Sequence, residues 1–222
     1  MKRFALLFLV LCVFAACKKK KEIPSYKVLI LGNSVTYSRA DTTYKWTGNW
    51  GMAATSADKD YVHLFTEELK KINSNNDVRI RNIAQFEVEF DTYNVAENLK
   101  DELAYNPDLL ILRIGENVTR TQEGDLFDLK YQGLINSFKA KNPSIKILAA
   151  GSVWPYRELA NEVMKKHSQF ISLDFLQYDT SNYAYGQFEN PAVQPHPSDK
   201  GMAAIARYLF ETVKPMLYPG NN

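Results

Sequence analysis

Cysteine is nearly absent from this sequence. Only two of the 222 residues are cysteines, Cys12 and Cys17. Because Cys12 lies in an apolar N-terminal segment typical of an export signal, a mature chain would keep Cys17 alone and would form no internal disulfide. This scarcity excludes thiol catalysis and a metal site with cysteine ligands.

Histidine is also scarce, and charge of either sign is nearly balanced. The three histidines, His63, His167 and His196, are scattered, and no pair of carboxylates brackets them. We therefore expect no metal and no other cofactor. The formal net charge is +2, and four consecutive lysines at 18–21 supply part of the positive excess. Such a balance is poor evidence for nucleic-acid binding, so nucleic acid is not an expected partner.

No apolar run is long enough for a permanent transmembrane helix. The longest, residues 4–14, follows two basic residues and is typical of a cleaved export signal. The small residues before Cys17 resemble a bacterial lipobox. We therefore predict a signal peptide at 1–16, lipidation at Cys17 and a tether at 17–26, whose lysines would lie beside anionic lipid. The expected protein is an exported, membrane-anchored lipoprotein, periplasmic or on the cell surface; an ordinary signal peptide cut nearby is the alternative.

The rest of the chain, 27–218, has the length of one domain with a substantial core. Apolar runs predict strands, and apolar residues at helical spacing predict helices, in alternation. Alternating strands and helices are typical of a three-layer α/β/α sandwich around a mainly parallel five-stranded sheet. The predicted strands are 27–32, 78–84, 108–115, 145–151 and 170–173, and the predicted helices are 58–72, 94–105, 126–140, 157–166 and 198–216.

The first strand ends at Gly32-Asn33-Ser34. The continuous apolar run before this segment suits a strand that is covered on both faces, as in a parallel sheet. Ligands of such sheets bind at the carboxyl ends of the strands. Ser34 would stand at that edge, which makes it the candidate nucleophile.

His196 is the candidate general base. Prolines on both sides stiffen its backbone and exclude a helix there, and Ser198 or Asp199 can cap the helix that follows. A histidine fixed just before a helix can point its ring at the edge of the sheet. By contrast, His63 lies within the first predicted helix, where a packed or capping role is expected.

Four short segments together resemble the sequence blocks of the SGNH (GDSL-like) hydrolases, in the same order: Gly32-Asn33-Ser34, Asn82-Ile83-Ala84, Gly115-Glu116-Asn117 and His196-Pro197. The resemblance implies a flavodoxin-like sandwich in which Ser34 attacks an ester carbonyl and His196 accepts its proton. It also implies an oxyanion hole made by the backbone N–H groups of Ser34 and Ala84 and by the side-chain amide of Asn117.

The sequence departs from the family pattern at three positions. Asn33 replaces the usual aspartate before the serine, Ala84 stands where glycine is common, and Val193 stands where an aspartate three residues before the histidine is usual. We therefore predict a Ser-His pair in which a main-chain carbonyl near Val193 or Gln194 orients His196. A carboxylate from elsewhere is the alternative, and the candidates are Glu116, Asp179 and Glu189.

All three tryptophans, Trp46, Trp50 and Trp154, lie in predicted loops. They could stack on sugar rings at the edge of the sheet, or they could form the cores of the loops themselves. With the expected export, they favour an O-acetyl or similar acyl ester on carbohydrate as the substrate.

Two other functions compete with ester hydrolysis. The missing aspartate would suit a catalytically silent glycan-binding lipoprotein on the same fold. A flavodoxin-like cofactor binder would place phosphate at the first loop, but residues 32–36 lack the further glycines that let a backbone approach a phosphate closely.

Overall fold

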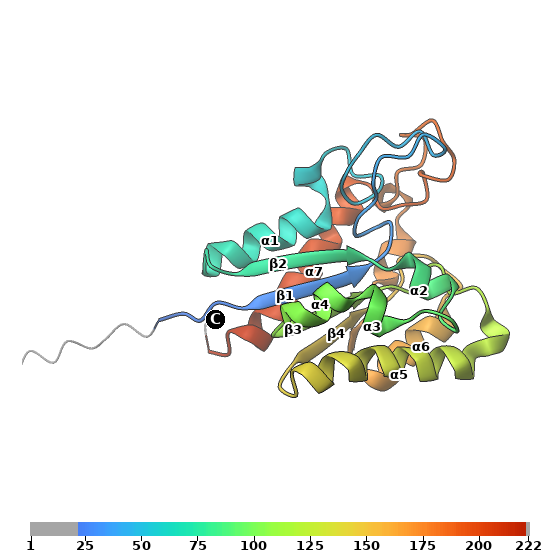
Figure 1. Ribbon diagram of the computed structural model, residues 1–222. Helices are drawn as coiled ribbons and strands as arrows, with labels where there is room; N and C mark the ends of the chain where they lie inside the picture. Colours follow the sequence, from blue (N-terminus) through green and yellow to red (C-terminus); the bar gives the residue numbers. More distant parts are fainter. Residues whose placement is uncertain (1–21, 221–222) are drawn as a thin grey trace, which may run out of the picture.

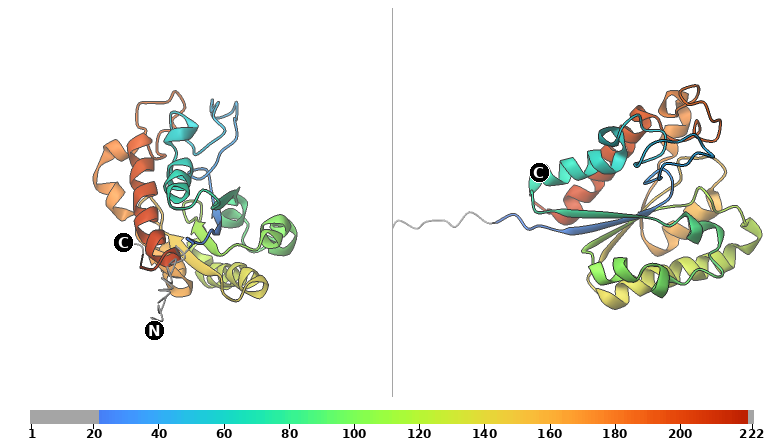
Figure 2. Two further views of the ribbon diagram at one scale, coloured as in Figure 1. Left: turned by 90° about the vertical axis from the view of Figure 1, so that its left-hand side faces the viewer. Right: turned by 45° about the horizontal axis from the view of Figure 1, so that its top comes forward.

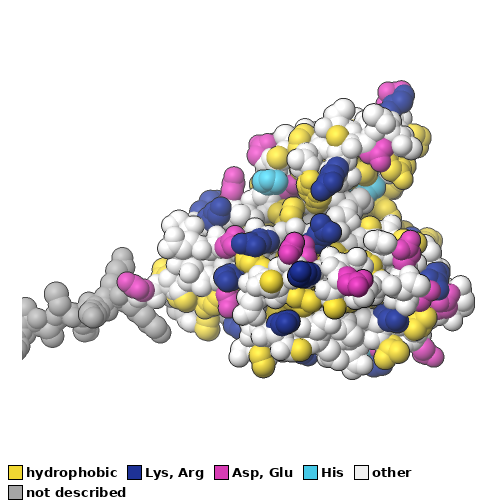
Figure 3. Space-filling model, in the orientation of Figure 1, with side chains coloured by type: hydrophobic (Ala, Val, Ile, Leu, Met, Phe, Trp, Pro, Cys, Tyr) yellow, Lys and Arg dark blue, Asp and Glu magenta, His cyan; other side chains and the backbone are white. Residues whose placement is uncertain are grey.

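The computed structural model describes residues 22–220. The predicted signal peptide, Cys17 and the four lysines lie outside the described residues, so the predictions made for them stay predictions. Within residues 22–220, no helix is both long enough and apolar enough to cross a bilayer. Acidic and basic side chains are interspersed over the face that Figure 3 shows.

Five strands form a single sheet, as predicted (Figure 1). The strands are β1 (Lys27–Gly32), β2 (Asp77–Asn82), β3 (Leu109–Arg113), β4 (Lys146–Ala150) and β5 (Gln169–Ile171). Their order is β2-β1-β3-β4-β5, and every neighbouring pair is parallel.

The helices agree with the prediction except near the end of β2. They are α1 (Tyr61–Ile72), α2 (Ala84–Val88), α3 (Val95–Asn98), α4 (Lys100–Tyr105), α5 (Gly124–Lys141), α6 (Glu158–His167) and α7 (Asp199–Leu217). The predicted helix 94–105 is two helices, α3 and α4, because the backbone of Leu99 leaves the helical region at φ −119° and ψ 27°. Helix α2 was not predicted.

The helices cover both faces of the sheet (Figures 1 and 2). Because side chains alternate along a strand, Val28 and Ile30 of β1 join the core on the side of α1 and α7. Leu29 and Leu31 join the core on the opposite side, with residues of α4, α5 and α6. Two covered faces explain why β1 is a continuous apolar run instead of an alternating one.

The order of the strands places a topological switch point between β1 and β3. The chain leaves β1 towards α1 on one face of the sheet and leaves β3 towards α5 on the other. Ligands of open α/β sheets bind outside the carboxyl ends of the strands at such a point. Ser34 follows β1 and Asn117 follows β3, so the fold brings both to this crevice.

Candidate active site

A tight turn carries Ser34 away from the end of β1. The carbonyl oxygen of Asn33 accepts hydrogen bonds from the backbone N–H groups of Thr36 and Tyr37, at 2.9 and 3.0 Å. Gly32 permits this turn, because a Cβ there would lie 1.8 Å from Thr36 Oγ1. Thr36 Oγ1 also lies 2.6 Å from the hydroxyl oxygen of Tyr61 on α1. The backbone that carries the Ser34 side chain is therefore held by Gly32 before it and by Thr36 after it.

Ser34 and His196 are in hydrogen-bond contact although 162 positions separate them in the sequence. Ser34 Oγ lies 2.8 Å from His196 Nε2, and His196 Nδ1 lies 3.1 Å from the carbonyl oxygen of Val193. A carbonyl oxygen can only accept, so Nδ1 carries the hydrogen of the neutral ring and Nε2 presents its lone pair to the serine hydroxyl. This is the tautomer that a general base needs.

The surroundings of His196 keep its imidazole neutral. The side chain is buried, and its ring packs edge-on against Trp154, with 5.4 Å between the ring centroids. Burial lowers the pKa of His196 to about 4, although the bond to the Val193 carbonyl partly opposes this shift. The Ser198 hydroxyl oxygen caps α7 directly after this segment, as predicted, by accepting from the backbone N–H of Gly201.

None of the three carboxylates considered as alternatives contacts the His196 ring within residues 22–220. Each is paired with a basic side chain: Asp179 with Lys200, Glu189 with Lys45, and Glu116 with Arg113. In the described structure the main-chain carbonyl of Val193 occupies the position that an aspartate would fill.

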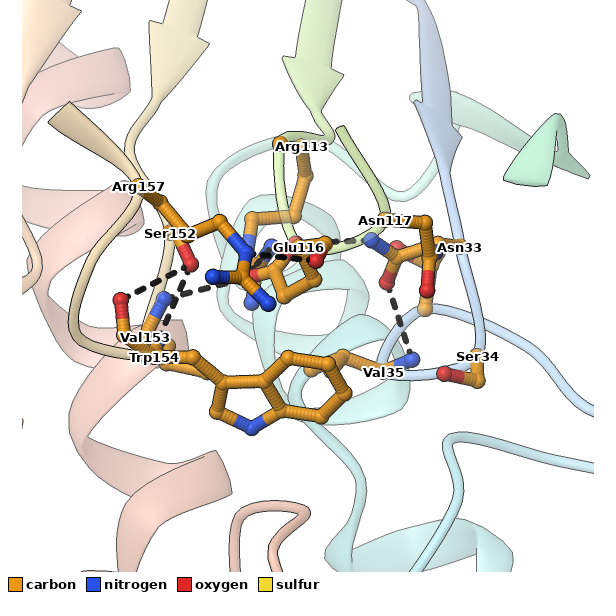
Figure 4. Close-up of polar contacts among 12 residues, drawn as sticks. Asn33, Ser34, Val35, Arg113, Glu116, Asn117, Ser152, Val153, Trp154 and Arg157 are labelled. Atoms are coloured by element: carbon orange, nitrogen blue, oxygen red, sulfur yellow. Dashed lines mark hydrogen bonds and ion pairs between the residues drawn. The ribbon is translucent and has the colours of Figure 1, made fainter. Parts of the chain in front are cut away.

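Glu116 is the centre of a buried polar cluster next to this pair (Figure 4). Its carboxylate accepts from Arg113 Nη1 and from Asn33 Nδ2, each at 2.7 Å, and from the backbone N–H of Val153 at 2.9 Å. Burial by itself would raise the pKa of Glu116, but the charge of Arg113 and the hydrogen bonds from Arg113, Asn33 and Val153 together hold the pKa below its usual range. The cluster ties together the segments that follow β1, β3 and β4.

Glu87 of α2 is a second buried carboxylate in this region, and no motif in the sequence indicates it. Its Oε1 accepts from the backbone N–H groups of Gly115 and Asn117, at 2.5 and 3.2 Å, and from Asn33 Nδ2 at 3.3 Å. Its Oε2 accepts from Asn117 Nδ2 at 2.8 Å. Burial, together with the nearby charge of Glu116, raises the pKa of Glu87 to about 7.

The three groups considered for an oxyanion hole differ in how free they are. The backbone N–H of Ser34 has no hydrogen-bond partner in the part of the chain that the structure describes. Asn117 Nδ2 uses one of its two hydrogens on Glu87, which leaves the other for a ligand. The Ala84 N–H donates to Asn82 Oδ1 at 2.9 Å, so it would have to exchange this partner for an oxyanion. Ala84 is not among the residues with positive φ, so its backbone does not require glycine.

The three tryptophans are not equivalent. Trp46 is only 4% exposed, and its ring contacts Trp50 and Phe188, so it forms the core of its loop. Of the two roles considered for Trp46, this burial favours the core of the loop over stacking on a sugar. Trp50 and Trp154 are half-buried, and Trp154 Nε1 donates to the carbonyl oxygen of Pro195 at 2.8 Å. Of the three, Trp154 is the one that contacts His196.

His63 lies in the first turn of α1, where its contacts are with Asp60. His63 donates from its backbone N–H to Asp60 Oδ1, the N-cap of α1, and its Nδ1 lies 2.8 Å from the same oxygen. Asp60 is thus the residue that caps α1, and His63 is a partner of this cap. Among the described residues, no group of three or more histidine, cysteine, aspartate or glutamate side chains is arranged to hold a metal ion.

Comparison with solved structures identifies the fold. A family two carbohydrate esterase from Cellvibrio japonicus is 17% identical, with a TM-score of 0.55 over 88% of this chain and 62% of that chain. A two-domain esterase active on acetylated mannans, co-crystallised with mannopentaose, is 19% identical, with a TM-score of 0.54 over 86% of this chain and 50% of that chain. A family 3 carbohydrate esterase from Clostridium thermocellum is 17% identical, with a TM-score of 0.56 over 87% of this chain and 98% of that chain.

These similarities concern the fold. This chain spans less than two thirds of the first two esterases, at 62% and 50% of their lengths. No protein-family model and no curated protein matches the sequence. The resemblance to SGNH hydrolases is confirmed at the level of the three-layer sandwich, which this chain shares with carbohydrate esterases.

Proposed function

We propose that this chain is a serine esterase that removes acyl groups, with O-acetyl favoured, from carbohydrate. One observation carries the proposal: Ser34 Oγ lies 2.8 Å from a neutral His196 Nε2 whose other ring nitrogen faces a carbonyl oxygen. A serine hydroxyl is a weak nucleophile by itself, and an adjacent base of the correct tautomer is what activates it. The fold shared with carbohydrate esterases supports the same class of reaction.

In the proposed reaction, Ser34 Oγ attacks the ester carbonyl carbon while His196 Nε2 accepts the hydroxyl proton. The imidazolium that forms keeps its Nδ1–H on the Val193 carbonyl and then gives the other proton to the leaving alcohol. Water next attacks the acyl-enzyme, with His196 again as the base, and releases the carboxylic acid and free Ser34. A pKa of about 4 leaves His196 unprotonated at neutral pH, so the base is ready to accept a proton.

The negative charge of the tetrahedral intermediate would be stabilised by the N–H of Ser34 and the free hydrogen of the Asn117 amide. The Ala84 N–H joins them if it leaves Asn82 Oδ1. Such donors act mainly on the transition state, because the carbonyl oxygen becomes fully anionic only as the intermediate forms. Removing one typically costs on the order of 10²- to 10³-fold in kcat.

A hollow beside Trp154 supports a carbohydrate substrate. It has a volume of about 290 Å³, and its lining includes Tyr156, which is 82% exposed, and Tyr178, which is 88% exposed. Tyr156 holds a φ of 61°, a left-handed conformation that is strained for a tyrosine. Asn161 and Gln177 also line the hollow and offer amide donors and acceptors. Exposed aromatic faces among amides suit sugar rings that carry hydroxyl groups.

The tyrosines give a test of the substrate class. Replacing Tyr156 and Tyr178 together by alanine is expected to raise KM for an acetylated oligosaccharide about 5- to 150-fold, because each of the two aromatic contacts is worth about 0.5–1.5 kcal/mol. KM for 4-nitrophenyl acetate should stay unchanged, since that ester carries no sugar ring to bind in the hollow. Tyr208→Ala, on α7 and not among the residues that line the hollow, is the control. Equal effects on both substrates would refute a sugar site here.

The activity itself is tested by measuring acetate released from a panel of acetylated oligosaccharides. Release by the wild type, and none by a Ser34→Ala variant, is the expected result. Binding of the glycan without release of acetate would favour the catalytically silent alternative.

We also propose that the chain is exported and held at a membrane by a lipid on Cys17. A Cys17→Ala variant expressed in a bacterium should move from the membrane fraction to the soluble fraction, whereas a Ser25→Ala variant should stay with the membrane. If both variants fractionate like the wild type, lipid attachment at Cys17 is wrong.

A further inference from the structure

The contacts of Glu87 are all with hydrogen-bond donors. Its two oxygens accept from two backbone N–H groups, at Gly115 and Asn117, and from two side-chain amides, those of Asn117 and Asn33. The side chain is fully buried, so solvent does not supply other partners. One carboxylate thus holds both the main chain and the side chain of Asn117.

We propose that Glu87 is a positioning residue for ester hydrolysis, which its ionised carboxylate assists by aiming the Asn117 amide at the oxyanion. This inference rests on the proposed function, because it gives Glu87 a role only if Asn117 stabilises the intermediate. Glu87 itself has no contact with Ser34 or His196 in the described structure, so it acts through Asn117.

Adding a proton to Glu87 would break this arrangement. A protonated carboxyl has an O–H donor on one oxygen, and each oxygen of Glu87 already faces at least one N–H group. The added hydrogen takes up acceptor capacity that these N–H groups use, and the neutral carboxyl accepts their hydrogen bonds more weakly. The Asn117 amide would be free to turn away from the crevice.

The charged groups near Glu87 come from the end of β3. Glu116 lies beside it and shares the Asn33 amide, which donates to Glu116 at 2.7 Å and to Glu87 at 3.3 Å. Arg113 is bonded to Glu116 and not to Glu87. The segment after β1 contributes the uncharged Asn33. Arg113 thus stabilises the ionised form of Glu116, whose pKa is lowered. Burial and the charge of Glu116 raise the pKa of Glu87 to about 7.

The two pKa values predict a rate that falls in two steps as the pH is lowered. Glu87 has a raised pKa, so it is ionised above about pH 7 and protonated below. His196 has a lowered pKa of about 4 and stays a competent base well below pH 7. We expect kcat for 4-nitrophenyl acetate to fall about 10- to 100-fold around pH 7 to a plateau, with KM unchanged, and to vanish near pH 4.

The test compares pH profiles of kcat for the wild type, Glu87→Gln, Asn117→Ala and the double variant. Glu87→Gln places an amide donor against Asn117 at every pH, so its kcat at pH 8.5 should be about 10- to 100-fold low and show no step near pH 7. The step should also be absent from Asn117→Ala, and adding Glu87→Gln to that variant should cost less than about threefold. Glu89→Gln, an exposed glutamate on the same segment, should match the wild type.

Two results would overturn the proposal: a step near pH 7 that persists in Asn117→Ala, or a loss in the double variant that equals the product of the single losses. The pH profile of Asn117→Ala is measured without Glu87→Gln, so this part of the test does not depend on whether Glu87→Gln folds. Failure of the proposed function is a separate result, because Ser34 would then not react with an organophosphonate in the wild type.

Discussion

Replacing Ser34 by alanine is expected to lower kcat for 4-nitrophenyl acetate by about 10⁶-fold, the loss typical of removing the nucleophile of a serine hydrolase. The reason is geometric: Ser34 Oγ is the only hydroxyl of the described chain in contact with His196 Nε2, at 2.8 Å. Ser25→Ala, an exposed serine that precedes β1, should keep the activity of the wild type.

The losses of activity on replacing Ser34 and His196 should not add. His196→Ala is expected to lose about as much activity as Ser34→Ala, and the double variant should lose no more than either, because each residue is useless without the other. Circular dichroism would show that the variants remain folded. If Ser34→Ala retained more than about 1% of the wild-type kcat, another group would have to be the nucleophile.

Replacing Arg113 by methionine is expected to lower the free energy of unfolding by about 3–5 kcal/mol, because it leaves Glu116 as an unpaired buried charge. Both side chains of this pair are at most 1% exposed, so water cannot replace the missing partner. Denaturant unfolding at pH 8 measures the effect. Adding Glu116→Gln to Arg113→Met should recover part of the loss, since a neutral side chain needs no counter-charge.

Arg81→Met is the matched control for this measurement. Arg81 is about half exposed and lies 3.6 Å from Glu102, so the loss of this ion pair should cost about 0–1 kcal/mol. If Arg113→Met were no more destabilising than Arg81→Met, the buried cluster would not be a determinant of stability.

The fold could be predicted from the sequence because its signals are local. A buried parallel strand such as β1 is a short run of apolar residues, and a covering helix such as α1 shows apolar residues at helical spacing. The short helix α2 was missed, because five residues carry too little periodicity. The division between α3 and α4 was missed because Leu99 is buried there by tertiary packing, which overrides helix propensity.

The candidate site could be predicted in part. Motifs predict Ser34 and His196, and the missing aspartate predicts the carbonyl of Val193. In the structure Ser34 Oγ lies 2.8 Å from His196 Nε2, and His196 Nδ1 lies 3.1 Å from the Val193 carbonyl oxygen. Glu87 could not be found in this way. In the sequence it stands between Phe86 and Val88 like any exposed glutamate, and only the folded chain surrounds it with donors.

The role of Trp46 also could not be predicted from local sequence. A tryptophan in a glycine-containing loop is equally compatible with a sugar-binding surface and with the core of that loop, because both bury one face of the ring. The contact with Phe188, 142 positions later, decides the question here, and no local pattern indicates it.

The central claim is that folding makes the Ser34 hydroxyl a nucleophile by placing it on His196. It is tested most directly by reacting the wild type with a serine-reactive organophosphonate and identifying the modified peptide by mass spectrometry. We predict a single adduct on Ser34 that forms at least 100-fold more slowly in His196→Ala. An adduct on another residue, no adduct, or an equal rate in His196→Ala would contradict the claim.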